Sequence, residues 1–123
     1  MVQKKFKVLL AEDEKIIALD IQRILLKAGY DVVSIVSKGE DAVLHSKTYL
    51  PDLVLMDIGL KGRMNGIEAG EMIKKELNVP IIYLSASSDY AKLENYRMKK
   101  NSNLLSKPFD ENALLAAINM VIS

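Results

Sequence analysis

Five polar residues lie at the ends of short, mostly apolar segments of this sequence. They are Glu12, Asp13, Asp57, Ser85 and Lys107. Three carboxylates in one low-dielectric crevice repel one another, so some of them would take up protons unless a cation lay among them. A hard divalent cation with oxygen ligands removes this conflict, and Mg²⁺ suits a site with few carboxylates and several retained waters. If the fold brings these residues together, they predict a Mg²⁺ site, with Mn²⁺ as an alternative ion.

Each of these residues alone also has an ordinary structural interpretation. An acidic residue after a strand often caps the next helix, which is a role open to Asp13 or Glu14. Ser85 alone is typical of a turn, and Lys107 alone of an exposed charge. The set as a whole favours a functional site because its members follow four different apolar segments.

The composition excludes several other kinds of site. With no cysteine and a single histidine among 123 residues, disulfides, thiolate nucleophiles and His-rich metal sites are ruled out. The net charge of +1 gives no general attraction to nucleic acid or anionic membranes. No apolar run approaches the roughly 20 residues of a membrane span, and the first residues lack the apolar core of a signal peptide. We therefore expect a single-domain cytoplasmic protein that binds no nucleic acid directly.

Two hydrophobic periods alternate along the chain and predict the elements that position the polar residues. Short apolar runs predict buried strands at residues 7–11, 31–36, 53–56, 81–84 and 104–106. Apolar residues at helical spacing predict helices over residues 17–28, 37–47, 67–77, 89–100 and from 110 onward. This alternation implies a parallel α/β sheet with right-handed crossovers and helices on both faces. Ligands bind beyond the carboxyl ends of the strands in such sheets, so all five polar residues can face one crevice.

Several residues predict where the helices begin and end. Ser37 and Glu40 fit a capping box at the start of the second helix, and Asp110 suits the N-cap of the last one. Gly29 is typical of a left-handed residue that ends the first helix. Met72 is one of the apolar residues expected to anchor the third helix against the sheet.

Over its whole length the chain resembles the receiver domain of two-component response regulators. Five pieces carry the resemblance, in this order: residues 8–14 (VLLAEDE), 51–57 (PDLVLMD), 64–66 (MNG), 85–86 (SA) and 106–109 (SKPF). The resemblance implies a doubly wound, flavodoxin-like fold with strand order 2-1-3-4-5. It also implies one receiver domain over residues 1–123, with no output domain in this chain.

The resemblance assigns roles to the polar residues. It implies that Asp57 accepts a phosphoryl group from a phosphohistidine on a sensor histidine kinase or a histidine phosphotransfer protein. Glu12 and Asp13 would be the acidic pair that holds Mg²⁺, while Asp57 would add a carboxylate ligand and Gly59 a backbone carbonyl. A cis peptide bond before Pro108 is implied in the same way.

The chemistry of these residues agrees with that assignment. A carboxylate is a competent nucleophile at phosphorus and forms an aspartyl phosphate. Because the attack brings two anions together, the task is mainly charge neutralisation and in-line positioning. Mg²⁺ would bind one phosphoryl oxygen, the Lys107 ammonium would neutralise another, and the Ser85 hydroxyl would donate a hydrogen bond to a third. Such a protein catalyses only its own phosphorylation and dephosphorylation and is not a turnover enzyme.

Three positions depart from the usual receiver pattern. The loop after Asp57 is one residue longer than usual and carries Lys61-Gly62-Arg63, an insertion that glycines should accommodate. Leu104 stands where many receivers carry Tyr or Phe, so we expect the response to phosphorylation to be relayed differently there. Gly59 offers no side chain to orient a water that attacks the aspartyl phosphate, so we expect hydrolysis without a phosphatase to be unassisted.

The resemblance also implies a partner surface on the face formed by the fourth helix, the fifth strand and the last helix. A downstream partner, or a second copy in a weak phosphorylation-dependent dimer, would bind there, and the chain would otherwise be a monomer. Tyr90 and Tyr96 belong either to that surface or to ordinary packing. His45 is expected to be a solvated residue of the second helix.

Three other classes of protein compete with this interpretation. An aspartate-nucleophile phosphatase would carry Asp-x-Asp after the first strand, where this chain has Glu12-Asp13-Glu14. A dinucleotide-binding module would carry a G-x-G-x-x-G motif there, and none is present. A degenerate receiver that serves only as an interaction module would be expected to lack some of the five polar residues, and all are present.

Overall fold

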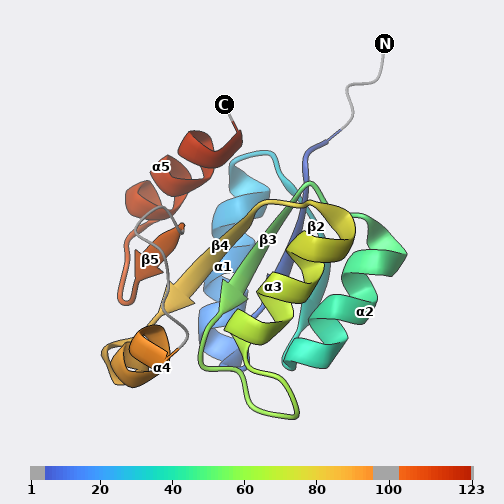
Figure 1. Cartoon of the computed structure of the whole chain (residues 1–123). Coiled ribbons are helices and arrows are strands. Elements are labelled where there is room, and N and C mark those ends of the chain that lie inside the picture. Colours follow the sequence, from blue (N-terminus) through green and yellow to red (C-terminus); the bar gives the residue numbers. More distant parts are fainter. Residues whose placement is uncertain (1–4, 96–102, 123) are drawn as a thin grey trace.

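The computed structural model describes residues 5–95 and 103–122, and its centre is a five-stranded parallel sheet. The strand order is β2-β1-β3-β4-β5, as predicted (Figure 1). The strands are β1 (Lys7–Ala11), β2 (Asp31–Val36), β3 (Leu53–Asp57), β4 (Ile81–Ser85) and β5 (Leu104–Ser106). Every residue of β3 and β4 is buried, including the polar Asp57 and Ser85 at their carboxyl ends, as expected of strands covered on both faces.

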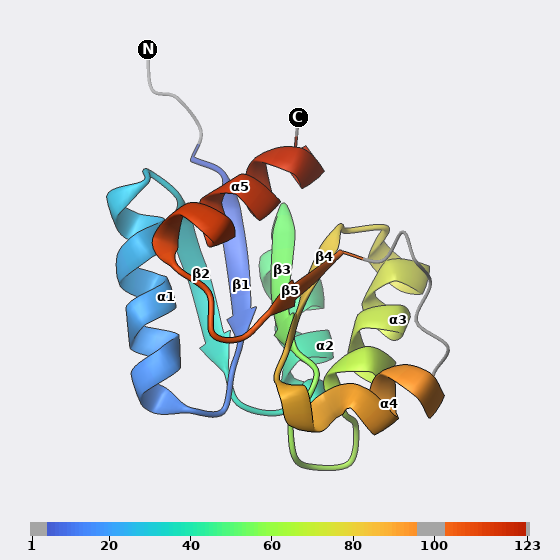
Figure 2. The ribbon, with the colours of Figure 1, turned by 90° about the vertical axis from the view of Figure 1, so that its left-hand side faces the viewer.

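The helices cover both faces of the sheet. They are α1 (Lys15–Lys27), α2 (Gly39–Tyr49), α3 (Gly66–Leu77), α4 (Tyr90–Asn95) and α5 (Glu111–Ile122), with a short 3₁₀ turn, η1 (Ser87–Asp89), before α4. Helices α1 and α5 lie on one face and α2 and α3 on the other, as Figures 1 and 2 show together. Among the described residues, no helix is both long and apolar enough to cross a membrane.

Alternate residues of the central strands feed two separate cores, because successive side chains of a strand point to opposite faces. In β1, Val8 and Leu10 pack with α1 and α5, whereas Leu9 and Ala11 pack with α2 and α3. Helices therefore pack against both faces of the sheet. This rigid support holds the ends of its strands in place.

Three helix-end signals are confirmed or newly found. Gly29 has a φ of +94° just beyond α1, and the Asp110 Oδ1 atom accepts the Ala113 N–H at 2.8 Å at the start of α5. A capping box that was not predicted begins α3, where Asn65 and Glu68 each accept the backbone N–H of the other.

Two predictions about helix caps and helix anchors are wrong. Lys38, not Ser37, precedes α2, and no side chain caps that helix. Glu40 instead accepts the backbone N–H of Arg63 at 3.4 Å in the loop after β3, so a tertiary contact takes the side chain assigned to the box. Met72 is 37% exposed and does not anchor α3. The predicted part of the fourth helix beyond residue 95, Tyr96 included, lies outside the described residues.

Candidate functional site

The predicted polar residues gather at the carboxyl ends of four neighbouring strands. Glu12 and Asp13 follow β1, Asp57 ends β3, Ser85 ends β4 and Lys107 follows β5. Because β1, β3, β4 and β5 are consecutive in the sheet, these ends lie at one edge. The fold thus brings together all five residues that the sequence singled out.

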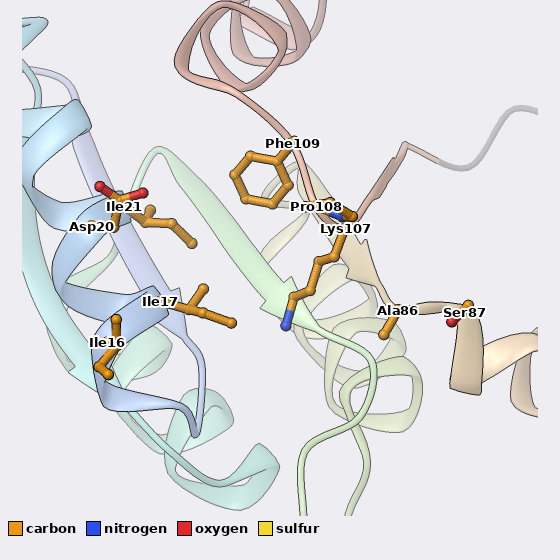
Figure 3. Close-up of a pocket in the computed structure, with 9 residues that line it drawn as sticks. All are labelled: Ile16, Ile17, Asp20, Ile21, Ala86, Ser87, Lys107, Pro108 and Phe109. Carbon is orange, nitrogen blue, oxygen red and sulfur yellow. The ribbon is translucent and has the colours of Figure 1, made fainter.

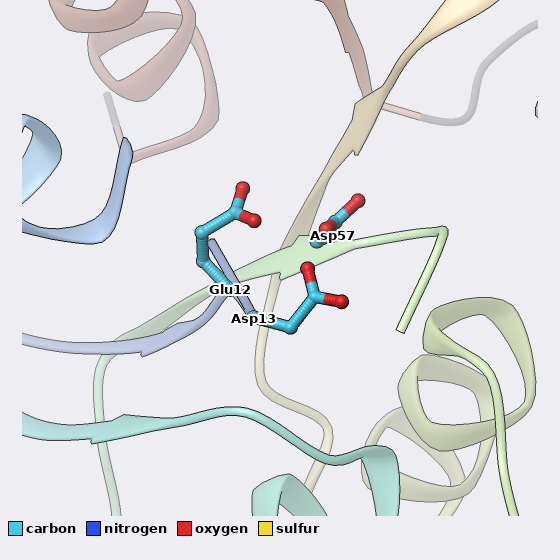
Figure 4. A group of neighbouring side chains, drawn as sticks. All are labelled: Glu12, Asp13 and Asp57. Carbon is cyan, nitrogen blue, oxygen red and sulfur yellow. The ribbon is translucent and has the colours of Figure 1, made fainter. Parts of the chain in front are cut away.

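The three carboxylates converge. One carboxylate oxygen from each of Glu12, Asp13 and Asp57 lies within 4.8 Å of the other two (Figure 4). Glu12 and Asp57 are buried, and Asp13 is partly exposed. The Gly59 N–H donates a 3.0 Å hydrogen bond to Asp57 Oδ1 and fixes that carboxylate. An all-oxygen donor set of this size fits Mg²⁺, which keeps several waters beside one to three carboxylates.

Lys107 supplies the positive charge of the site. Its Nζ atom donates to Glu12 Oε1 at 2.7 Å and lies 3.4 Å from Asp57 Oδ2. The side chain is only 13% exposed. The Lys107 N–H donates to the Ser85 carbonyl at 2.7 Å, and the peptide bond between Lys107 and Pro108 is cis, as the resemblance implies. The hydrogen bond between Lys107 and Ser85 joins the residue after β5 to the end of β4. The Lys107 ammonium then lies beside the carboxylates of Glu12 and Asp57.

Ser85 lies at the same edge of the sheet and faces a cavity. It is buried and lines a cavity of about 260 Å³ with Ala86, Tyr90, Leu93 and Lys107, among others. This space gives the hydroxyl room to change its orientation.

Leu104, two residues before Ser106 on β5, is 41% exposed and pairs in register with Tyr83.

The electrostatics of the site reflect its burial. Burial raises the pKa of Glu12 to about 7, against the lowering effects of its hydrogen bonds from Lys107 and from the Glu14 N–H. Burial raises the pKa of Asp57 as well, against the Gly59 N–H and the Lys107 charge. Burial acts to lower the pKa of Lys107, but its hydrogen bond to Glu12 and the charge of Asp57 outweigh this and raise it. Removal from water is thus the main cause of the raised pKa values of Glu12 and Asp57, and a bound cation would favour their charged forms.

Without a divalent cation, the Glu12 contribution to stability should fall as the pH rises from about 4.5 to about 7. The folded state retains a proton on Glu12 through this interval, whereas the unfolded chain releases it near the lower value. The loss should be on the order of 1–3 kcal/mol. Thermal unfolding of the wild type and of Glu12→Gln in a chelator, measured across this pH range, tests it. The wild type should lose stability relative to Glu12→Gln as the pH rises; parallel curves would contradict the prediction.

Sequence reasoning missed a further acidic residue at this site. Asp89 is 4% exposed and lines a cavity of about 380 Å³ together with Asp13, Asp57, Gly59 and Lys92, among others. The missed signal is local: Asp89 stands three residues after Ala86, at the spacing at which an acidic side chain returns to the N–H at the start of a helical turn.

The longer loop after β3 contains a glycine in a left-handed conformation and contacts the residue before α2. Gly62 adopts a φ of +109°, a conformation that favours glycine, and Lys61 forms an isolated parallel bridge with Lys38. The insertion is thus held against the start of α2.

His45 is not simply solvated, since it is partly buried and its Nδ1 atom lies 2.7 Å from the Ser34 Oγ in a hydrogen bond.

The doubly wound fold and the acidic edge define a class of protein, and comparison with known proteins identifies it. Residues 8–119 match the model of the response regulator receiver domain. The chain therefore belongs to the family of response regulator receiver domains.

Individual relatives agree with this assignment. The chain is 35% identical over 117 residues to the transcriptional regulatory protein PdtaR of Mycobacterium tuberculosis, covering 95% of this chain and 57% of that protein. It is 33% identical over 116 residues to the chemotaxis protein CheY of Thermotoga maritima, covering 94% and 96%. The chain thus spans about half the length of PdtaR but nearly all of CheY.

A solved structure supports the fold. The signal receiver domain of a modulated diguanylate cyclase from Desulfovibrio desulfuricans G20 superposes with a TM-score of 0.85 at 32% identity, covering 97% of this chain and 94% of that one. Receiver domains are signalling switches and not turnover enzymes, and they bind Mg²⁺ at an acidic cluster. The family assignment leaves the phosphatase and dinucleotide-binding interpretations without support.

Proposed function

We propose that this chain is a phosphoacceptor switch of a two-component phosphorelay. Asp57 takes the phosphoryl group from a phosphohistidine on a sensor histidine kinase or a histidine phosphotransfer protein. The observation that carries this proposal is the position of Asp57. Its Oδ1 is held by the Gly59 N–H at 3.0 Å, its Oδ2 lies 3.4 Å from the Lys107 Nζ, and the carboxylates of Glu12 and Asp13 lie beside it.

We expect the transfer to be an in-line displacement. An oxygen of Asp57 attacks phosphorus, the new O–P bond forms as the P–N bond of the phosphohistidine breaks, and the imidazole leaves with the bonding pair. Glu12, Asp13, Asp57 and the Gly59 carbonyl would hold Mg²⁺, which neutralises negative charge on the phosphoryl oxygens when bound. Lys107 would exchange its contact with Asp57 for one with a phosphoryl oxygen, and the Ser85 hydroxyl would donate a hydrogen bond to another phosphoryl oxygen.

Phosphorylation by a small donor tests this proposal directly. The chain is incubated with acetyl phosphate or phosphoramidate and Mg²⁺, and its intact mass is measured. We expect one added phosphoryl group that depends on Mg²⁺. A chain that gains no phosphoryl group and does not bind beryllofluoride, a stable mimic of that group, would instead be an interaction module.

The protein donor would dock beside this site. An apolar groove of about 590 Å³ lies between α1 and the segment that follows β5, and its walls include Ile16, Ile17, Lys107 and Phe109 (Figure 3). Lys107 belongs to both the groove and the acceptor site, and Ile16 is 84% exposed. A helix that carries the phosphohistidine would cover these apolar side chains while presenting its imidazole to Asp57.

Ile16→Asp should slow phosphotransfer from a protein donor by roughly tenfold or more, because it places a charge in an apolar contact. Uptake from acetyl phosphate should be unchanged, since Ile16 does not touch the acceptor. The measurement compares both donors, using a phosphorylated phosphotransfer protein that serves the wild type. Leu44→Asp is the matched control, because Leu44 is an exposed leucine on α2. Equal slowing by both variants would argue against the groove.

We further propose that residues 1–123 form one receiver domain whose state is read by a partner or by segments outside this sequence. The reading face would be that of α4, β5 and α5, where Tyr90, Leu104 and Met120 are exposed apolar or aromatic side chains. Such a face suits a partner or a weak dimer that forms on phosphorylation. We expect the unphosphorylated chain to be a monomer. We also expect the protein to be located in the cytoplasm.

A further inference from the structure

Asp89 is a buried carboxylate that shares a cavity with the phosphoacceptor. It stands at the end of η1, where the chain turns from β4 into α4. Its Oδ2 atom accepts the Ala86 N–H at 2.8 Å, and its own N–H donates to the Ala86 carbonyl at 3.0 Å. These two bonds close the turn that immediately follows Ser85.

Asp89 lies close to the side of Gly59 that carries no side chain. A β-carbon on Gly59 would lie 3.3 Å from Asp89 Oδ1 and 3.7 Å from Asp57 Oδ1. The carboxylates of Asp57 and Asp89 therefore border the same small space, which a larger residue at position 59 would fill. The position that the sequence marks as lacking a side chain is thus bordered by an acidic group from another loop.

The charge of Asp89 is only loosely balanced. Its Oδ1 atom lies 3.8 Å from the Nζ of Lys92, whose side chain is 43% exposed. Lys107 is engaged with Glu12 and Asp57. A dianionic phosphoryl group added at Asp57 would enter a cavity whose wall carries this buried negative charge as well as the positive charges of Lys61 and Lys92. Like charges at short range repel, so we expect the new group to act against Asp89.

We propose that Asp89 is a positioning residue that couples the charge on Asp57 to the start of α4. The inference rests on the proposed function. In the unmodified protein, Asp89 holds the Ala86 N–H and keeps the η1 turn closed. A phosphoryl group on Asp57 drives the Asp89 carboxylate away from Gly59 toward Lys92 and solvent, which breaks its bond to Ala86 and frees the turn that leads into α4. This path requires no aromatic residue at position 104.

Because such coupling is reciprocal, removing the opposing charge should favour the modified state. Asp89→Asn retains an oxygen that can accept the Ala86 N–H but removes the charge. We expect this variant to bind beryllofluoride about fivefold more tightly than the wild type at saturating Mg²⁺. Asp110→Asn is the matched control, since Asp110 also accepts a backbone N–H at 2.8 Å, near the start of α5, and it should bind like the wild type.

A structure of the wild-type chain with beryllofluoride and Mg²⁺ provides a second test that needs no variant to fold. The Asp89 carboxylate should have left the Ala86 N–H; an intact bond would overturn the proposal. Equal or weaker binding by Asp89→Asn would overturn it as well, since a merely structural turn residue predicts that result. A wild type that does not bind beryllofluoride would overturn the proposed function, and this inference with it.

Discussion

Asp57→Asn should abolish phosphoryl uptake from acetyl phosphate. The amide is not a nucleophile at phosphorus, so no O–P bond forms. The fold should survive, because the amide is isosteric and its oxygen can still accept the Gly59 N–H that now bonds Oδ1. Stability without Mg²⁺ should be unchanged or slightly higher, since one of three mutually repelling carboxylates is gone.

Intact mass after incubation with donor and Mg²⁺ measures the uptake, and thermal unfolding checks the fold. Asp52→Asn is the matched control, because Asp52 precedes the same strand, β3, at its opposite end and accepts the Lys7 N–H. The control should take up a full phosphoryl group. Uptake by Asp57→Asn that maps to a different carboxylate would show that the acceptor has been assigned to the wrong residue.

Lys107→Met should slow phosphoryl uptake by roughly 10²–10³-fold, the usual effect of removing one group that stabilises developing charge. Methionine fills the space of the lysine stem but leaves the phosphoryl oxygens without the ammonium. It also leaves Glu12 and Asp57 without their positive partner, so the chain should be less stable at neutral pH. Added Mg²⁺ should restore part of that stability, because the cation takes over the neutralisation.

Lys47→Met is the matched control, because it removes a different lysine that also forms an ion pair. Lys47 pairs with Glu76 at 2.9 Å, but both side chains are largely exposed, and such pairs contribute about 0–1 kcal/mol. Its phosphorylation rate and stability should therefore stay close to those of the wild type. Single-turnover rates and thermal unfolding with and without Mg²⁺ provide the comparison. A Lys107→Met rate within a factor of two of the wild type would show that the ammonium does not act on the phosphoryl group.

The sequence was sufficient to predict the sheet and the gathering of the polar residues. Hydrophobic periodicity depends on local geometry, with a period of two in strands and 3.6 in helices, and here the two periods alternate cleanly. Once a parallel sheet follows from that alternation, strand ends must share an edge. The placement of Glu12, Asp13, Asp57, Ser85 and Lys107 at one edge is then a consequence of chain order.

Local signals failed where a side chain had a choice between a local and a distant partner. Glu40 has the right spacing for a capping box, yet it accepts the backbone N–H of Arg63, which lies in the loop after β3. His45 has a polar helical neighbourhood, yet it reaches Ser34 on β2. Sequence spacing cannot rank such alternatives, because the competing partner is far away in the chain.

The sequence alone therefore determined the strands, the helices and the chemical character of the site. These features depend on residue type and on neighbours within a few positions. Tertiary packing alone decided the charge balance: Lys107 meets Glu12 at 2.7 Å although 95 residues separate them. It also brought Asp89 beside the empty side of Gly59. Burial then raised the pKa of Glu12. Distances and desolvation arise only when remote segments close on one another, and these quantities govern how the acceptor site responds to charge.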